Sequence, residues 1–201
     1  MSSKPDLKLD WCSYKAAKYA VEHWHYSHSL PTPPLVKFGV WEDNKFVGCI
    51  LISRGANKNI GTSYGLQPTE IAELSRIALS QHKHEVTSMI KVVMHGMKKN
   101  YPGIRLIVSY ADTNQNHIGS IYQAYNFIYV GMTSNTYLYE DKNNRIWHQR
   151  QVSKTGIKPQ YGTLRVVPKI ESCKKILQTG KHKYLYPLDK RMRKRLSGLA
   201  K

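Results

Sequence analysis

Residues 104–131 constrain the fold more than any other stretch of this sequence. Their parts are a β-rich run, a polar turn, a helix-like segment and the start of a new strand, at residues 104–110, 111–114, 117–125 and 128–130. So short a succession of elements predicts one folded unit and excludes two separate lobes. The turn places Asp112 at the C-terminal end of a strand, which is where ligands bind in open α/β sheets.

Polar side chains follow this strand end closely. They are Asp112, Asn114, Ser120 and Tyr122. Together they predict a ligand-binding mouth. The alternative is an ordinary strand–helix–strand unit in which Tyr122 and Tyr125 only pack.

The composition fits one well-buried domain with a tail, because the chain has 201 residues of which 41% are hydrophobic. No apolar run has the length of a membrane span, and residues 1–10 contain no signal-peptide core. Cys12, Cys49 and Cys173 are widely spaced and form no Cys-x-x-Cys pair. These features predict a cytoplasmic protein without a structural zinc site.

The formal net charge is +18, which suggests a polyanionic partner, most simply nucleic acid. Positive charge is densest at the end of the sequence. Residues 174–201 contain ten Lys and Arg against one acid, Asp189, and so contribute +9. The alternative is a solvated basic tail with no role in binding.

In the first half of the chain, residues 11–24 favour a helix, and residues 35–42 and 45–54 a hairpin across Asp43-Asn44. Residues 55–68 are glycine-rich and polar and predict a loop. Residues 85–100 favour a second helix, because apolar side chains recur there at helical spacing.

A histidine-rich loop follows the first predicted helix, and Pro31 prevents the helix from continuing. Its histidines are His23, His25 and His28. A metal site is one interpretation, although no acid lies among the three. We favour a loop that faces the substrate and predict no metal; a packed or exposed surface loop is the third alternative.

The last third of the chain is harder to interpret. Residues 137–139 and 145–152 predict a second hairpin. Three more segments are expected, a loop, a short strand and a short helix, at residues 153–161, 162–169 and 171–179. We therefore expect a catalytic domain at residues 1–152 and a basic C-terminal extension at residues 153–201 that packs on the same domain.

The order of these elements resembles that of the GNAT N-acyltransferases across about residues 12–152. The features that match are Asn114 in the turn, Tyr122 in the helix and the run at residues 126–131. This resemblance implies an α+β fold with a central, mixed, mostly antiparallel sheet flanked by helices, here with the basic C-terminal extension. It alone leads us to expect a strand at residues 72–79, because the spacing of apolar residues there also suits a helix.

Within that superfamily the chain resembles the phage Mom proteins. The shared features are short and lie at residues 25–28, 73–76, 110–112 and 183–188, with Tyr122 ten residues after Asp112. The resemblance implies an enzyme that converts the N6 amino group of adenine in double-stranded DNA to an acetamido (carbamoylmethyl) derivative, which blocks restriction. It also implies action in the host cytoplasm if the chain is phage-encoded.

One departure from the GNAT pattern concerns the donor. The family places a glycine-rich loop before the long helix so that backbone N–H groups reach the pyrophosphate of CoA. Here residues 80–85 contain no glycine, although Lys83 and His82 could attract an anion. The donor is therefore open between acetyl-CoA and another acyl donor, such as an aminoacyl-tRNA.

The resemblance and the chemistry of N6 transfer suggest roles for the polar residues. Asp112 is the candidate base that accepts the N6 proton; the alternative is that it only caps its turn by bonding to Asn114. Tyr122 is the candidate acid that protonates the leaving group; the alternative is that it is a tyrosine of the core. Tyr26 and His25 would stack on or orient the adenine.

Donor and DNA contacts complete the expected site. Arg76 would bind a phosphate or carboxylate of the donor, unless it forms an ion pair with Glu73 or Asp112. The other expected donor contacts are Ser75, Asn114 and Lys83. The expected DNA contacts are His28, Lys190, Arg191, Arg193, Lys194 and Arg195. Two rival functions remain, namely a CoA-dependent N-acetyltransferase of a protein or small molecule and a non-catalytic nucleic-acid binder.

Overall fold

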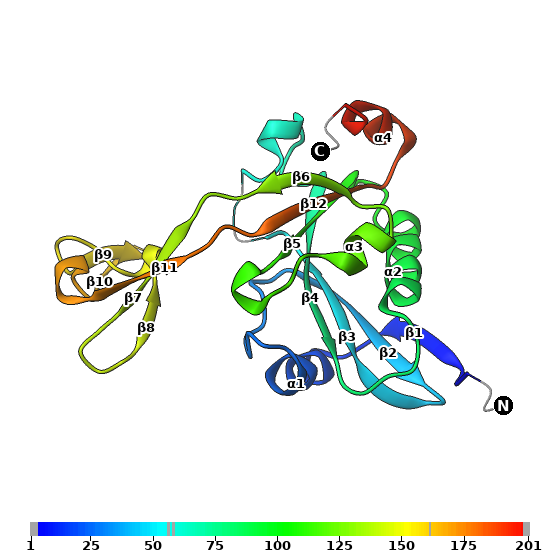
Figure 1. Cartoon of the computed structure of the whole chain (residues 1–201), viewed down its shortest axis with the longest axis horizontal. Helices are drawn as coiled ribbons and strands as arrows, with labels where there is room; N and C mark the ends of the chain where they lie inside the picture. The colour runs from blue at the N-terminus through cyan, green and yellow to red at the C-terminus, as the bar shows by residue number, and fades with distance from the viewer. Residues whose placement is uncertain (1–3, 56, 58, 161, 199–201) are drawn as a thin grey trace. The chain divides into compact units, whose positions relative to one another are not determined.

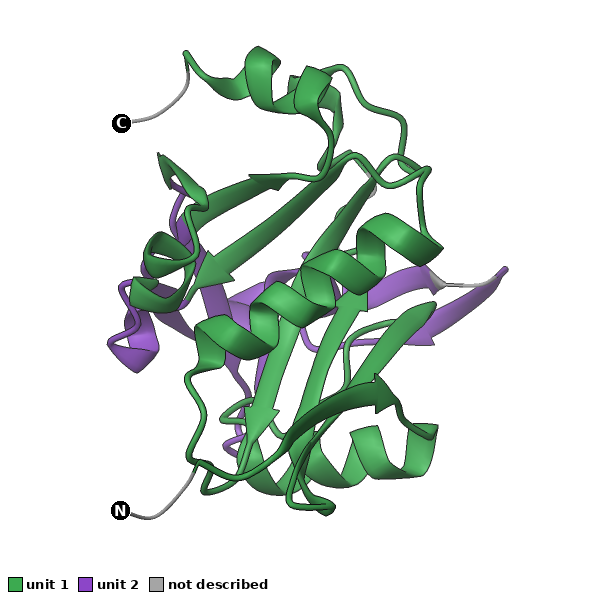
Figure 2. Cartoon of the chain, turned by 90° about the vertical axis from the view of Figure 1, so that its right-hand side faces the viewer, with its two compact units in different colours: residues 1–111, 119–131, 183–201 green, residues 112–118, 132–182 purple. Residues whose placement is uncertain are grey.

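A computed structural model describes residues 4–55, 57, 59–160 and 162–198. The chain forms two compact units, coloured separately in Figure 2. The core unit comprises residues 1–111, 119–131 and 183–201. The insert unit comprises residues 112–118 and 132–182.

The core unit contains a seven-stranded sheet in the order β1-β2-β3-β4-β5-β12-β6 (Figure 1). In sequence order the strands are Leu7–Trp11 (β1), Leu35–Glu42 (β2), Lys45–Ser53 (β3), Ile71–Leu79 (β4), Leu106–Ala111 (β5), Ile128–Met132 (β6) and His182–Pro187 (β12). Strands β1 to β4 pair antiparallel, whereas β4 and β5 are parallel. The expected mixed, mostly antiparallel sheet of an α+β fold is thus confirmed, including the strand at β4.

The hairpin of β2 and β3 follows from its two-residue turn. Asp43 and Asn44 have φ angles of 48° and 64°. Positive φ at both central positions belongs to the turn that matches the twist of paired strands, and Asp and Asn tolerate it. The turn sets Glu42 opposite Lys45.

Helices cover both faces of the sheet because residues of β3 alternate between them. Cys49 and Leu51 pack with Ala17, Ala20 and Val21 of helix α1 (Tyr14–Trp24). On the opposite face, residues of β3 pack against α2 (Val86–Asn100); the apolar partners are Ile50, Ile52, Met89, Ile90, Val93, Met94 and Met97. Two shorter helices are α3 (Ser120–Ala124) and α4 (Lys190–Leu196). Among the described residues, no helix has the length and apolar character needed to cross a membrane.

Strand β12 and helix α4 are part of the core unit rather than an extension, which corrects the expected architecture. Strand β12 lies between β5 and β6 in the sheet. Its Tyr184 and Leu185 are 1% and 0% exposed and belong to different core clusters. Helix α4 packs on the unit through Met192 and Leu196, which are also buried.

A stability measurement tests this placement of β12. Tyr184→Ala removes a buried ring whose hydroxyl accepts a hydrogen bond from Gln123 Nε2 at 2.9 Å. We expect the free energy of unfolding to fall by about 3–5 kcal/mol. The exposed Lys190→Ala should stay within about 0.5 kcal/mol of the parent. Equal denaturation midpoints for both variants would mean that the segment is a dispensable appendage.

The insert unit joins β6 to β12, two neighbouring strands of the core sheet. It contains a three-stranded sheet in the order β11-β7-β8 and a separate hairpin of β9 and β10. The bounds are Thr136–Glu140 (β7), Ile146–His148 (β8), Ile157–Gln160 (β9), Thr163–Val166 (β10) and Lys174–Gln178 (β11). These units divide the chain differently from the expected boundary at residue 152, because residues 183–201 belong with the core.

Two elements of this unit differ from the sequence-based expectation. Residues 171–179, expected as a helix, contain β11, which pairs antiparallel with β7 along its whole length. The loop expected at residues 153–161 contains β9. Pairing with the distant strand β7 overrides weak local propensity for β11, whereas β9 is completed by a hairpin with the following strand β10. Near the start of the chain, Trp11 ends strand β1 and the helix begins only at Tyr14.

Candidate active site

Strands β4 and β5 stop pairing within the core unit, and polar groups gather at that point. Their register runs from Ile71 opposite Leu106 to Leu74 opposite Ser109, so the rest of β4 lies beyond the last pair. The Ser109 hydroxyl is buried and donates to the Leu74 carbonyl oxygen at 3.1 Å. It also forms a hydrogen bond with Tyr122.

Helix α3 carries Tyr122 to this position. The residue is 8% exposed, and its ring packs against Phe127 and Tyr184 at centroid distances of 5.3 and 5.4 Å. Burial raises the pKa of Tyr122 to about 12, and the bond to Ser109 opposes this shift. The phenol is therefore neutral at pH 7 and carries a proton to donate. The packing contacts considered as an alternative for Tyr122 are thus present, together with the hydrogen bond to Ser109, and its role as an acid stays a prediction.

The histidine-rich loop begins where α1 ends, at His25, which is 9% exposed. The backbone N–H of Ser27 donates to His25 Nδ1 at 3.1 Å, and the Ser27 hydroxyl lies 2.8 Å from the same atom. Because an N–H group only donates, Nδ1 is the accepting nitrogen and the neutral ring carries its proton on Nε2. Tyr26 stacks on His25 at 4.3 Å and is 42% exposed, so it offers an aromatic face.

The other two histidines of the loop bond to backbone oxygens. His23 Nδ1 lies 2.8 Å from the Tyr19 carbonyl, and His28 Nδ1 lies 2.7 Å from that of Glu22. Within the described part of the chain, no group of three His, Cys, Asp or Glu side chains is arranged to hold a metal ion.

Arg76 of β4 ties the sheet to this loop. Its Nε donates to the Ser29 carbonyl at 3.1 Å and its Nη1 to the Ser75 carbonyl at 2.7 Å. Burial lowers the pKa of Arg76, while the charges of Tyr26 and Glu73 act in the opposite direction; the guanidinium still stays charged at neutral pH. Arg76, Ser75, His25 and Tyr26 thus belong to one region of the core unit.

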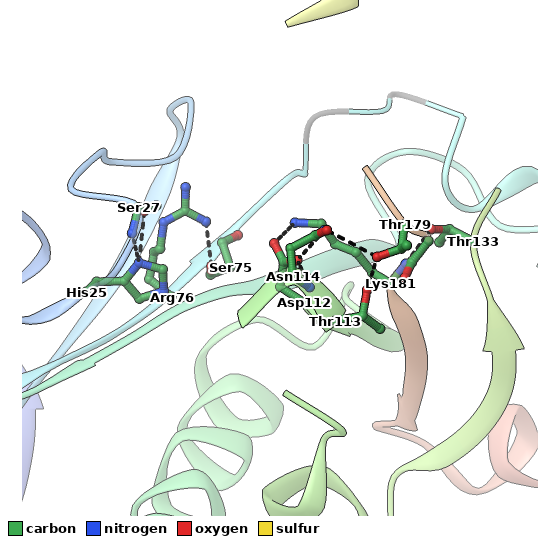
Figure 3. A network of polar contacts seen from close by, with 11 residues as sticks. His25, Ser27, Ser75, Arg76, Asp112, Thr113, Asn114, Thr133, Thr179 and Lys181 are labelled. Atoms are coloured by element: carbon green, nitrogen blue, oxygen red, sulfur yellow. Dashed lines mark hydrogen bonds and ion pairs between the residues drawn. The ribbon is translucent and has the colours of Figure 1, made fainter. Parts of the chain in front are cut away.

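Asp112 follows β5 directly and belongs to the insert unit. Figure 3 shows its contacts with Asn114 and Lys181. Its Oδ1 accepts from the backbone N–H and the side-chain amide of Asn114, each at 3.1 Å. Its Oδ2 accepts from Lys181 Nζ at 2.6 Å. Burial acts to raise the pKa of Asp112, but the hydrogen bonds from Lys181 and Asn114 outweigh it and hold that pKa below its ordinary value.

The turn-capping contact considered as an alternative for Asp112 is therefore present, together with an ion pair that sequence reasoning missed. The backbone N–H of Lys181 donates to the Thr133 hydroxyl, which holds the lysine beside this turn. Asn114 accepts a hydrogen bond from Thr179 at 3.1 Å. Lys181 lies 69 residues from Asp112, and no local pattern signals such a contact.

Known proteins resemble this chain in sequence and in fold. The sequence profile of the Mom protein family matches residues 6–201. The chain belongs to the Mom family. It is 23% identical over 197 residues to the methylcarbamoylase Mom of Escherichia phage Mu, covering 96% of this chain and 80% of the phage Mu protein. The resemblance to the Mom proteins is thereby confirmed.

Solved structures give the fold class of this Mom-family chain. An aminoglycoside N(6′)-acetyltransferase of Legionella pneumophila matches 96% of this chain and 98% of its own, with 7% identity and a TM-score of 0.50. An N-acetyltransferase of Staphylococcus aureus covers 91% and 98%, with 8% identity and a TM-score of 0.49. The fold is that of the GNAT N-acyltransferases, as expected.

The loop before α2 does not fit the pyrophosphate of CoA. The backbone N–H of Lys83 donates to both carboxylate oxygens of Glu42 at 2.9 Å, and the N–H of His84 donates to Oε1 at 2.7 Å. His84 Nδ1 also lies 2.9 Å from Oε1. The amides that would receive a phosphate thus bind a carboxylate of the chain itself. Burial acts to raise the pKa of Glu42, but these bonds lower it, so Glu42 is anionic at neutral pH.

A titration tests this conclusion for the Mom-family chain. We expect CoA and acetyl-CoA to bind the parent protein more weakly than about 1 mM by calorimetry. Glu42→Ala should bind CoA about tenfold more tightly or better, because it frees the two amides and removes the repelling charge. Micromolar binding of CoA by the parent protein would contradict the assignment.

The five cations of α4 all lie on its exposed side. They are Lys190, Arg191, Arg193, Lys194 and Arg195. Asp189 caps the helix by accepting from Met192 N at 2.6 Å, and it pairs with Arg105 Nε at 2.9 Å. The helix is thereby docked, and its five cations are exposed.

Proposed function

We propose that this Mom-family chain transfers an acyl-derived, carbamoylmethyl group to the N6 amino group of adenine in double-stranded DNA and so protects the DNA from restriction. The match to the Mom family along almost the whole chain carries the proposal. The net charge of +18 supports a polyanionic substrate.

The chemistry first requires access to the base. Adenine N6 is paired inside the duplex, so the enzyme extrudes the nucleotide and holds the base by stacking. The exposed ring of Tyr26, backed by His25, supports a stacking role. His28, in the same loop, would contact the neighbouring DNA backbone.

Transfer then forms a bond from N6 to the incoming carbon, breaks the bond from that carbon to the leaving group, and removes one proton from N6. In this proposal Asp112 accepts the N6 proton, and Tyr122 protonates the leaving group. Arg76, with Ser75, Asn114 and Lys83, would hold polar groups of the donor. The contacts of Glu42 favour a donor that does not rely on a pyrophosphate at α2.

Analysis of nucleosides tests the product. DNA from bacteria that express the chain should contain a deoxyadenosine whose mass has increased by one carbamoylmethyl group, and it should resist cleavage by some restriction enzymes. A Tyr122→Phe strain at equal expression provides the control. Unmodified adenine alongside abundant folded protein would overturn the proposal, and an acetylated protein or small molecule would favour the CoA-dependent alternative.

The Asp112→Asn variant distinguishes two roles of Asp112, a catalytic base and a residue that only caps its turn. The Asn side-chain oxygen can still accept the hydrogen bonds from Asn114, so the turn should survive, but the amide cannot take up a proton at neutral pH. We expect at least a 100-fold loss of modified adenine per total adenine. Because the pKa of Asp112 lies below its ordinary value, the carboxylate should stay ionised, and the parent active, down to a lower pH than an ordinary aspartate would allow.

Lys181→Met is the matched variant for this prediction. It removes the ammonium that pairs with Asp112 and so raises the pKa of the carboxylate. If Asp112 is the base, this variant should lose activity at a higher pH than the parent. Near-parental activity of Asp112→Asn would leave the carboxylate with a structural role only.

A further inference from the structure

The hairpin of β9 and β10 in the insert unit sets two cations directly opposite each other. Its antiparallel register pairs Lys158 with Arg165. Residues that are paired across two strands point to the same face, and like charges in this arrangement destabilise a hairpin. An anion bound on this face would relieve the repulsion.

A groove of about 480 Å³ lies on this hairpin. Four of the residues that line it are cations, Arg145, Arg150, Lys158 and Arg165, and none of the lining residues is Asp or Glu. Trp147 lies among them. The Lys158 ammonium donates to the Arg150 carbonyl oxygen, which connects the hairpin to the segment that follows β8.

One cation of the groove is held in a fixed orientation. The guanidinium of Arg145 stacks on the Trp147 ring at 4.1 Å. The indole Nε1–H donates to Asp141 Oδ2 at 2.7 Å, and the Arg145 backbone N–H donates to Oδ1 at 3.0 Å. A guanidinium stacked in this way keeps its planar N–H groups for an external acceptor, and phosphate oxygens match that geometry.

From these features we propose that the groove of the insert unit binds the phosphate backbone of duplex DNA. The inference rests on the proposed DNA substrate and adds a surface distinct from α4. The insert unit carries ten Lys and Arg against four Asp and Glu, a net charge of +6. Two of the groove cations lie on the hairpin, and two, Arg145 and Arg150, precede it in the chain. Four cations spread in this way suit successive phosphates of a duplex better than one small anion, and such binding is independent of base sequence.

Salt-dependent binding of the full-length protein tests the proposal, with a mixed-sequence duplex as the probe. Lys158→Gln with Arg165→Gln should lower the slope of log affinity against log salt by about 1.8, because each phosphate contact contributes about 0.9. Affinity at low salt should fall about ten- to a hundredfold. The matched control is Lys142→Gln with Lys154→Gln, which removes two exposed charges of the same unit outside the groove and should change the slope by less than about 0.5.

The outcomes separate this inference from the proposed activity. A lower slope for the groove variant supports the groove even if no modified adenine is found, because binding is measured without catalysis. An unchanged slope overturns the groove proposal even if the parent modifies DNA. A variant that loses affinity for tRNA but keeps its affinity for the duplex also overturns it. Circular dichroism establishes that each variant is folded before titration.

Discussion

Tyr122→Phe should lower the rate of adenine modification by about 100-fold or more and leave DNA binding unchanged. The hydroxyl group lies beside Ser109, at the last pair of β4 and β5, and the pKa of about 12 keeps its proton in place at neutral pH. Loss of a positioned general acid costs about this much. The measurement is modified adenine formed per unit time at equal protein concentration.

The alternative is that Tyr122 has only a packing role. Its ring contacts with Phe127 and Tyr184 are the contacts that such a role requires. Phenylalanine preserves the ring, so a packing role predicts a small change in activity. Tyr125→Phe provides the matched control, since Tyr125 directly follows the same helix and also packs on aromatic rings. Equal activity of the two variants would remove Tyr122 from the proton-transfer step.

The central elements of the fold were predictable because local signals agreed with the global structure. Residues 104–131 combine a β-rich run, a polar turn and a short helix, and the structure places β5, α3 and β6 there. The strand at β4 could not be predicted from local signals. Its apolar residues suit either a helix or a strand, and only the resemblance to the GNAT proteins indicated the strand.

The end of the chain could not be interpreted from composition alone. A segment dense in Lys and Arg is typical of a solvated tail. In the structure, however, Tyr184 and Leu185 of β12 are buried in the core. The pairing partners of β12 are far away in sequence, and the insert unit separates it from β6. Contacts over such distances leave no periodic signal near either partner.

The same limit applies to the candidate site. Asp112 and Tyr122 were identified because they stand near a strand end, which is a local feature. Their decisive neighbours are remote: Lys181 lies 69 residues from Asp112, and Glu42 lies 41 residues from Lys83. The absence of glycine at residues 80–85 made the CoA site doubtful but did not indicate what the amides before α2 bind. The structure shows that they bind the carboxylate of Glu42.

Replacing Arg191, Arg193, Lys194 and Arg195 of α4 by Ala should weaken DNA binding alike for all sequences and lower the salt slope by roughly two to four units. The four cations are exposed, whereas Met192 and Leu196 anchor the helix. Alanine favours the helix and keeps those anchors, so the fold should be preserved. Titrations of several duplexes over a range of salt concentrations measure the slope.

Charges on α2 provide the comparison for this prediction. Lys91, Lys98 and Lys99 are exposed on that helix of the core unit. Their replacement by Ala should leave the slope close to that of the parent protein if α4 forms the DNA contact. The reverse result, an unchanged slope for the α4 variant and a lower slope for the α2 variant, would move the contact to α2. The α4 variant and the groove variant replace different residues, so the two sets of substitutions can be combined in one protein. If the two surfaces contact different phosphates, the salt slope of the combined variant should fall by the sum of the two separate changes.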